Sequence, residues 1–492
     1  MIRRVRGRIG TRLAGALGLA VGLAAALPVA VTAHTLNATY TSRLPLAVYL
    51  VGAATTVALS FVFVIVRDVR AAPPVLDATG SLPPAWLRYL LRAIGLIGWA
   101  WIVVQGIAGG SSDANVASLF LWVYGWVGLA LLSATVGPVW HFLDPFSTLH
   151  DLGAALLRTL PIEGWAPADY PASFGRWPAV VGFAFFVWLE LVIQAGPATL
   201  FIVLVGYTAF TLAMMAQFGR DEWRSQGETF TVWFRLLGRL AWFRLVDEDG
   251  WVRRRTFGSG LLEPGWTPAD VTLAALGVSS IIFDGLSQTE VFFNLFGAPG
   301  IPERTILLFG FLGIVVLMAF GVARTVGLGA IGAGLLPIAL GYLIAHYLTY
   351  LLINGQYIIV AVSDPLQKGS DLFGTGFYVP TGAWLPPGLI WTIQLAAVVG
   401  GHMLGAWGGH VVAVADAPPG LQRAALRNRQ VPLAVVMVSL TTLTLWSLGQ
   451  AIVVTPPASS DLGGPDPQAP QAGVVTSRDA GTHSSSERTS AR

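Results

Sequence analysis

Apolar stretches of about twenty residues follow one another along this chain and constrain its fold more than any other feature. A helix rises about 1.5 Å per residue, so about 20 apolar residues cross the hydrocarbon core of a bilayer. Hydrophobic residues make up 54% of the 492 and charged residues only 11%, against about 25% charged in soluble proteins. The pattern predicts an all-α polytopic transmembrane helix bundle, with about ten spans after an N-terminal signal segment. We place the spans near residues 44–66, 88–108, 116–138, 177–196, 198–217, 269–288, 305–323, 329–352, 387–412 and 431–453.

The two ends of the chain differ from the apolar middle. Residues 1–33 have the pattern of a signal peptide or an uncleaved signal anchor, with arginines, an apolar run and a small-x-small site ending at Ala33. Cleavage there would leave His34 at the N-terminus, where its amine and imidazole together can bind copper; chance placement is the alternative. Residues 34–454 are then the transmembrane bundle, and the polar residues 455–492 are expected to be disordered.

Arginines gather in alternate loops, which predicts the orientation of the bundle. Eight of them lie in the segment 218–267, and the other arginine-rich loops fall on the same side by parity. Loops rich in arginine stay in the cytoplasm. We therefore expect a multi-pass protein of a prokaryotic plasma membrane, with the mature N-terminus and the C-terminal tail extracytoplasmic.

The segment 218–267 is expected to be a cytoplasmic amphipathic segment. Between Gly219 and Arg244, aromatic and aliphatic residues recur at helical spacing. This pattern predicts one interfacial helix whose arginines contact acidic lipids, with a partner helix as the alternative. The nearby Asp144-Pro145 and His150-Asp151 pairs are interpreted as structural, the first as a turn that starts a helix.

Three ionisable side chains on three predicted helices share one depth near the outer face. Glu190 lies in the outer third of its helix, Asp284 lies near the outer end of the next, and His346 lies about 9 Å from the end of a third. Such residues inside a membrane are costly and mark functional sites by default. Taken singly, they also fit an interfacial carboxylate, a turn cap and a packing histidine. Together they predict a polar site that neutralises itself, binds a cation or performs acid–base chemistry.

Further polar residues are predicted to approach this depth from both sides. A re-entrant or extracytoplasmic loop at 353–375 carries two aspartates, for which Asx turns are the alternative. His402 comes from a neighbouring helix, with simple packing as the alternative. The chain has no cysteine, so a zinc, manganese or cobalt ion would need imidazole and carboxylate ligands. The expected metal ligands are His346, Asp284, Asp364, Asp371 and His402.

Three stretches carry a resemblance to a known family. They are FDGLS at 283–287, AHYLTYLLINGQ at 345–356 and SDPLQKGSDLFGTG at 363–376. With residues 188–191, Gly401-His402 and the spacing of the spans from about 44 to 453, they resemble the fenitrothion hydrolase family of bacterial and archaeal membrane proteins. One departure is the turn Leu143-Asp144-Pro145-Phe146, where the family has a WNPW- or FNPW-like turn. The resemblance implies hydrolysis of an organophosphorothioate aryl ester at the membrane, and it carries over no catalytic residue.

Two functions fit these observations, and the sequence leaves both open. The first is an integral membrane hydrolase of organophosphate or phosphorothioate aryl esters, with Asp284, His346 and Glu190 as general base or metal ligands. Its lipophilic small-molecule substrate would arrive from the lipid bilayer. The expected substrate contacts are Tyr350, Gln356 and Ser370. The second is a membrane transporter or copper-handling protein that uses the same cluster, with 353–375 as a gate. No nucleic-acid partner is expected, and the oligomeric state is not specified by the sequence.

Overall fold

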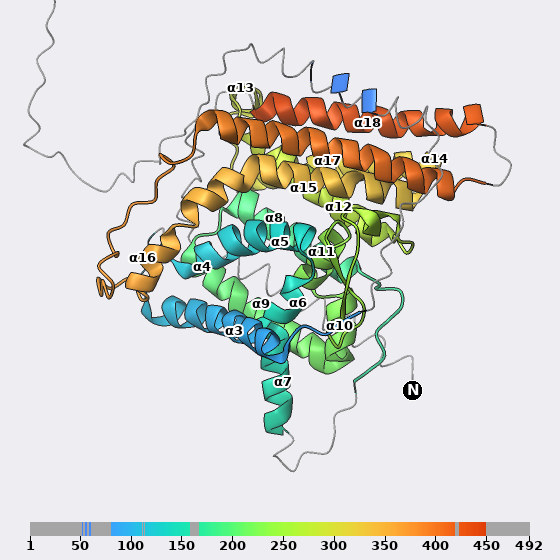
Figure 1. Cartoon of the computed structure of the whole chain (residues 1–492). Coiled ribbons are helices and arrows are strands. Elements are labelled where there is room, and N and C mark those ends of the chain that lie inside the picture. Colours follow the sequence, from blue (N-terminus) through green and yellow to red (C-terminus); the bar gives the residue numbers. More distant parts are fainter. Residues whose placement is uncertain are drawn as a thin grey trace, which may run out of the picture. The chain divides into compact units, whose positions relative to one another are not determined.

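The computed structural model describes residues 80–448 apart from 111, 113, 158–166 and 419–422, together with five positions between 52 and 60. The predicted signal segment, His34, most of the predicted span 44–66 and the tail 455–492 lie outside the described residues. Within the described part, helices joined by loops make up most of the chain, and its strands form one two-stranded sheet (Figure 1). The prediction of an all-α polytopic bundle is confirmed, and the chain is a multi-pass membrane protein.

Eight helices in the described ranges are long and apolar enough to cross a membrane. Each predicted span from residue 88 onward matches an observed helix, and 177–196 matches a shorter apolar one. That shorter helix consists of α8 (Trp177–Trp188) and the π-helix η2 (Leu189–Ile193). The long helices are α3 (Ala85–Ala108), α4–η1–α5 (Val116–Ser118, Leu119–Leu129, Ala130–Thr135), α9 (Pro197–Phe218), α12 (Pro268–Ser287), α14 (Ile301–Val326), α15 with α16 (Leu328–Asn354, Tyr357–Ser363), α17 (Pro387–Ala415) and α18 (Arg423–Leu448).

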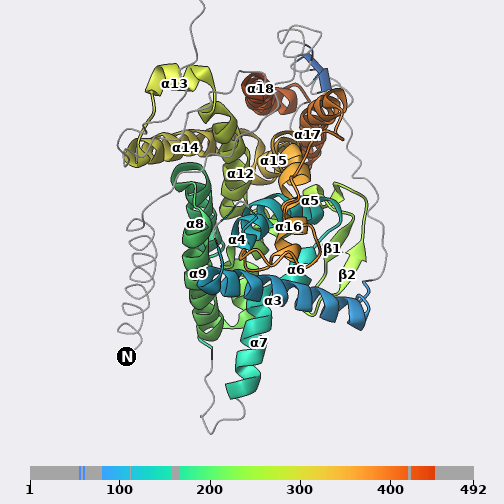
Figure 2. The same ribbon diagram turned by 90° about the vertical axis from the view of Figure 1, so that its left-hand side faces the viewer.

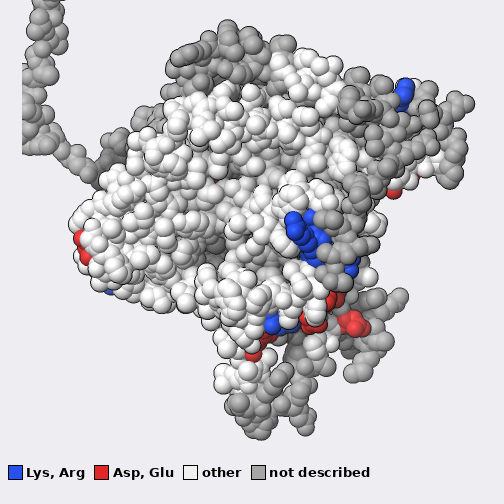
Figure 3. All heavy atoms as spheres, in the orientation of Figure 1, with Lys and Arg blue, Asp and Glu red and all other residues white. Residues whose placement is uncertain are grey.

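The surface that these helices expose around the outside of the bundle is apolar. Large side chains on α3 and α14 are widely exposed, such as Ile107 at 74% and Leu317 at 73%. Figure 3 shows one face on which most of the described surface is neither basic nor acidic, while most of the charged side chains lie at the lower right and a few lie at the left edge. A soluble protein rarely exposes so continuous an apolar surface, so this surface is suited to contact lipid.

Helix α15 lies at the centre of the bundle and packs closely against α17 (Figure 1). Glycines make this approach close. A Cβ atom at Gly401 would lie 2.6 Å from the carbonyl oxygen of Pro337, and one at Gly405 would lie 2.3 Å from that of Gly334. Small residues let the backbones of membrane helices come together. His346 therefore lies on a helix, α15, whose position is fixed by close packing along much of its length.

The start of α12 is fixed by local sequence and by a neighbour. The Thr267 hydroxyl accepts the backbone N–H of Asp270, and the Asp270 carboxylate accepts the backbone N–H of Thr267, which is a capping box. Pro268 occupies the first turn, where a missing N–H costs nothing. The buried Asp270 also pairs with Arg176 at 2.7 Å, which ties the start of α12 to the start of α8.

The segment 218–267 is not the single amphipathic helix expected between Gly219 and Arg244. It contains two short helices, then a hairpin in which Arg244 pairs with Arg253 in register, then a 3-10 turn. These elements are α10 (Arg220–Gln226), α11 (Thr229–Leu237), β1 (Phe243–Leu245), β2 (Val252–Arg254) and η3 (Ser259–Leu262).

Two physical reasons make that expectation wrong. The Glu228 carboxylate accepts the backbone N–H groups of Phe230 and Thr231, so it caps a new helix and interrupts the first one. The apolar face is also covered by protein rather than lipid, since Trp223 and Trp233 are only 2% and 3% exposed. A helical period predicts an apolar face, but it does not show whether protein or lipid covers that face.

Short helices complete the described chain. Asp144 precedes α7 and accepts the backbone N–H of Phe146 at 2.9 Å and the Ser147 hydroxyl at 2.5 Å. The predicted turn and helix start at Asp144-Pro145 is thereby confirmed. The remaining short helices are α6 (Val139–Leu143), α7 (Pro145–Leu157) and α13 (Glu290–Phe296).

Candidate functional site

An aspartate and a histidine from two packed helices form the centre of the candidate site. Asp284 lies in the last turn of α12, and His346 lies two turns before the end of α15. The His346 Nε2 atom is 2.8 Å from Asp284 Oδ2. Their side chains are 6% and 16% exposed, so the pair is almost enclosed. The structure therefore brings together two of the three residues predicted to form the site.

Tyr347 connects this pair to the third predicted residue. Its hydroxyl oxygen lies 2.9 Å from Asp284 Oδ2 and 3.2 Å from Glu190 Oε1. Tyr347 was not among the predicted site residues, whereas Tyr350, one turn further along the same helix, was an expected substrate contact. In the structure the Tyr350 ring lies edge-on to that of Tyr347, with 6.4 Å between the ring centres. The sequence did carry a signal for Tyr347, since it directly follows His346, a histidine predicted to lie inside the membrane.

Glu190 is placed by an irregular part of its helix. It lies in the π-helix η2, which ends at Gln194 in a left-handed conformation with φ 51°. Single-turn π segments often occur at functional positions. The Glu190 Oε2 atom is buried and has no hydrogen-bond partner among the described residues. Figure 2 shows α8, α12 and α15 as neighbouring helices, and the site lies where η2, α12 and α15 approach one another.

The contacts of this cluster fit an extra proton on Glu190. The Tyr347 hydroxyl has one hydrogen, so it cannot donate to both carboxylates. Asp284 Oδ2 lies 2.8 Å from His346 Nε2, and its other oxygen accepts from Gln288 Nε2 at 2.8 Å. If Tyr347 donates to Asp284, its contact with Glu190 is satisfied when Glu190 is a neutral carboxyl group that donates to the Tyr347 oxygen. An ionised Glu190 would be a buried and unpaired charge, which is costly.

The resulting arrangement is a hydrogen-bonded chain from Glu190 through Tyr347 and Asp284 to His346. It joins three helices, and with Glu190 neutral it holds a proton that an ionised pair of carboxylates would lack. Such a chain can pass a proton along its length. The imidazole Nδ1 atom of His346 has no described hydrogen-bond partner, so that end of the chain is available to a further group.

The other two predicted substrate contacts, Gln356 before α16 and Ser370 after it, bond to the chain around them. Gln356 donates to the carbonyl oxygens of Leu352 and Thr381. Ser370 donates to Asp364 at 3.0 Å. None of these described contacts reaches Glu190, Asp284 or His346, so the geometry gives these two residues a role in shaping the loop.

The two loop aspartates also bond within their own turn. Asp364 accepts the backbone N–H groups of Lys368 and Gly369. Asp371 accepts the backbone N–H group of Gly376 and the hydroxyl group of Ser363. Both aspartates thus stabilise the loop, as the turn interpretation expects, but their bonds span four or five residues or reach back to Ser363, which is longer than the spacing of an Asx turn. The loop follows α16, so the predicted segment 353–375 is a short helix followed by a turn-rich loop.

His402 occupies the interface between α15 and α17. Its Nδ1 atom lies 2.8 Å from the carbonyl oxygen of Val398, and its Nε2 atom lies 3.3 Å from the Tyr342 hydroxyl. These contacts match the packing alternative. In the described part of the chain, no group of three or more His, Asp or Glu side chains is placed to hold a metal ion. The five residues expected to share a metal are thus not gathered into one group.

No protein-family model, curated protein or solved structure matches this chain.

Proposed function

We propose that the chain is a membrane transporter whose solute movement is coupled to a proton held by Glu190, Tyr347, Asp284 and His346. The observation that supports this best is the continuous hydrogen-bonded chain across three helices. Ionisable groups that pair inside a membrane are typical of proton relays in pumps and transporters. A relative movement of α8 or η2 against α15 would break the Glu190–Tyr347 contact and release that proton.

Proton flux into proteoliposomes tests the proposal. The purified protein is reconstituted with an internal pH-sensitive dye, and a potassium gradient with valinomycin drives protons inward. Wild-type protein should admit protons faster than protein-free liposomes. Asp284→Asn and Tyr347→Phe should reduce that flux about tenfold or more, since each removes one link of the chain. The matched control is Glu290→Gln, which neutralises an exposed carboxylate in α13. Equal flux in the wild type and Asp284→Asn would overturn the proposal.

Glu190→Gln separates the proton assignment from a general structural effect. Glutamine has nearly the shape of a neutral glutamate and can still donate to Tyr347. The variant should therefore keep the wild-type melting temperature while losing proton flux, because an amide cannot release the proton. A large fall in melting temperature would mean instead that Glu190 is ionised in the folded protein.

A second candidate is the membrane hydrolase of aryl phosphate or phosphorothioate esters. The observation in its favour is the Asp284–His346 contact with the Nδ1 atom free of described partners. A carboxylate that orients an imidazole is a common general-base arrangement. His346 would take a proton from water as the water oxygen bonds to phosphorus, and the P–O bond to the aryloxide would break. Hydrolysis of a chromogenic aryl phosphorothioate by wild-type protein and Glu290→Gln, but not by His346→Ala, would support this candidate over transport.

A further inference from the structure

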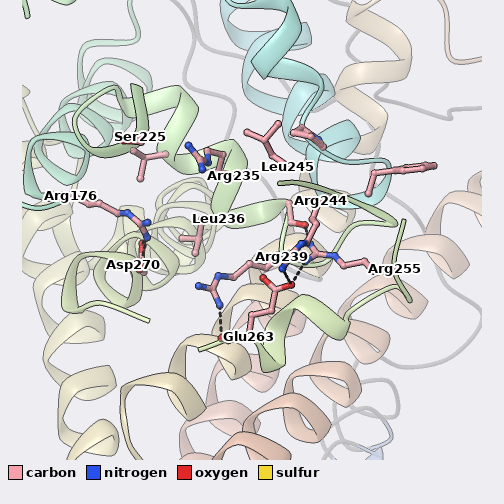
Figure 4. Close-up of a pocket in the computed structure, with 14 residues that line it drawn as sticks. Arg176, Ser225, Arg235, Leu236, Arg239, Arg244, Leu245, Arg255, Glu263 and Asp270 are labelled. Carbon is pink, nitrogen blue, oxygen red and sulfur yellow. Dashed lines mark hydrogen bonds and ion pairs between the residues drawn. The ribbon is translucent and has the colours of Figure 1, made fainter. Parts of the chain in front are cut away.

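A cavity lined by arginines lies at the opposite end of α12 from the candidate site. Its volume is about 170 Å³. Its walls come from α11, the β1–β2 hairpin, the η3 region and the start of α12 (Figure 4). Because a cavity of only about 10–15 Å³ holds a water molecule, this one has room for a small polyatomic ion. The arginines that line it are Arg176, Arg235, Arg239, Arg244 and Arg255.

The carboxylates in and beside the cavity are too few for these arginines. Asp270 is held by Arg176 through both of its oxygens, at 2.7 and 2.9 Å. Arg244 and Arg255 share one oxygen of Glu263, at 2.8 and 2.9 Å. Two guanidinium groups therefore divide one negative charge, and an arginine does not lose its proton in a protein.

The other two arginines add to the excess. Arg235 pairs with Glu248 at 2.6 Å. Arg239 donates to the backbone carbonyl of Glu263 at 2.9 Å and lies over the ring of Trp266, 4.3 Å from its centre, and no carboxylate contact is described for it. Burial lowers the pKa of Arg239, despite the nearby Asp270 and Glu263 carboxylates. Five positive charges thus face three carboxylates, which leaves two positive charges in a partly closed space.

We infer that this cavity, defined by the five arginines above, binds a phosphate-bearing anion. Buried charges are normally paired, and the surplus here is positive. The guanidinium group matches the oxygens of phosphate with two parallel hydrogen bonds. The Arg244 Nε atom is buried without a described partner, so a donor is left over for such an anion. This inference is independent of the proposed transport function.

The phosphate can come from two sources. The cavity lies in the arginine-rich segment 218–267, which is predicted to face the cytoplasm, where the leaflet carries anionic lipids. A lipid headgroup such as that of phosphatidylglycerol is one source, and a soluble phosphate compound is the other. Both present the same oxygens to the arginines.

Thermal unfolding of the full-length protein tests the inference. The protein is delipidated in neutral detergent, and its melting temperature is followed with added inorganic phosphate against chloride at equal ionic strength. A parallel series compares short-chain phosphatidylglycerol with phosphatidylcholine. A ligand that binds only the folded state raises the melting temperature. The test variants are Arg244→Gln and Arg235→Gln, whose side chains are each 36% exposed. Arg244 lies on β1 and Arg235 lies on α11, so one variant still tests the inference if the other does not fold.

The matched control is Arg254→Gln, which removes an exposed arginine of β2 that does not line the cavity. The anion should raise the melting temperatures of the wild type and of this control equally. Each test variant should need about tenfold more anion for the same rise, because it has lost one charged hydrogen bond to the anion. Stabilisation by inorganic phosphate identifies a soluble source, and stabilisation by phosphatidylglycerol alone identifies a lipid. Equal responses in all four proteins, or no response to either probe, would overturn the inference.

Discussion

Single carboxylates in this chain are satisfied in two different ways. Asp144 and Asp364 accept N–H groups from residues two to five positions further along the chain, and these bonds stabilise their own turns, although Asp144 also pairs with Arg224 of α10. Glu190 and Asp284 are bonded to side chains that come from another helix. Only the second kind can report a movement of one helix against another, because the contact breaks when the helices separate.

His141 is a residue for which burial has a measurable consequence. Its Nδ1 atom lies 3.1 Å from Arg224, a buried arginine that also pairs with Asp144 at 3.2 Å. Burial and the neighbouring Arg224 lower the pKa of His141 to about 2. Unfolded histidine titrates at about pH 6.5. Below that pH, the unfolded chain therefore binds a proton that the folded chain does not bind.

Stability is therefore expected to decrease as the pH falls from about 6.5 to 5. The His141 contribution approaches about 1.4 kcal/mol per pH unit below about pH 6, and it is absent above about pH 7. Detergent-solubilised protein unfolded thermally at several pH values would measure it. His141→Asn should flatten the acid side of the profile, whereas Leu152→Ala, at an exposed position on α7, should keep the wild-type slope. The same slope in wild type and His141→Asn would contradict the expected effect.

At the level of helices, the contact between α15 and α17 depends on which face of α17 carries glycine. Gly400 and Gly401 are neighbours, yet a Cβ atom at Gly400 would meet nothing within 4 Å, whereas one at Gly401 would meet the Pro337 carbonyl at 2.6 Å. Alanine in an open helix position is more stable than glycine by up to about 1 kcal/mol. The two substitutions should therefore have opposite signs.

Gly400→Ala is expected to leave the melting temperature unchanged or slightly higher, and Gly401→Ala to lower the free energy of unfolding by about 1–3 kcal/mol through overpacking. Thermal or denaturant unfolding in detergent would measure both changes. The second variant should also disturb the adjoining His402. Similar stabilities for the two variants would mean that α17 does not approach α15 as closely as described.

The sequence predicted the long helices well because one physical property, apolar length, determines them. It also placed Glu190, Asp284 and His346 at one depth, since depth follows from counting residues along a helix. It did not single out Tyr347, because the rotation of α15 about its axis depends on packing against α12 and η2. It also assigned Asp364 and Asp371 to the site, and their described contacts are with the loop itself and with Ser363 at the end of α16. The depth of a residue in the membrane follows from one helix alone, whereas a contact between residues depends on how two segments pack.

At the scale of the whole molecule, α12 joins the two polar regions. Asp270 near its start pairs with an arginine that lines the basic cavity, and Asp284 near its end holds His346. Fourteen residues of helix separate them, which corresponds to about 21 Å. The two regions are therefore predicted to face opposite sides of the membrane, one near each end of a single span.

Labelling of single cysteines from one side tests this arrangement. The chain has no cysteine of its own, so no background residue has to be removed. Lys368→Cys lies in the loop after α16 and Arg254→Cys lies in β2, both at exposed positions. On intact cells a membrane-impermeant maleimide should label Lys368→Cys, and it should label Arg254→Cys only after permeabilisation, because arginine-rich segments remain in the cytoplasm. The reverse pattern would place the basic cavity outside and the Asp284–His346 pair at the cytoplasmic end, which would exclude a cytoplasmic phosphate compound as its ligand.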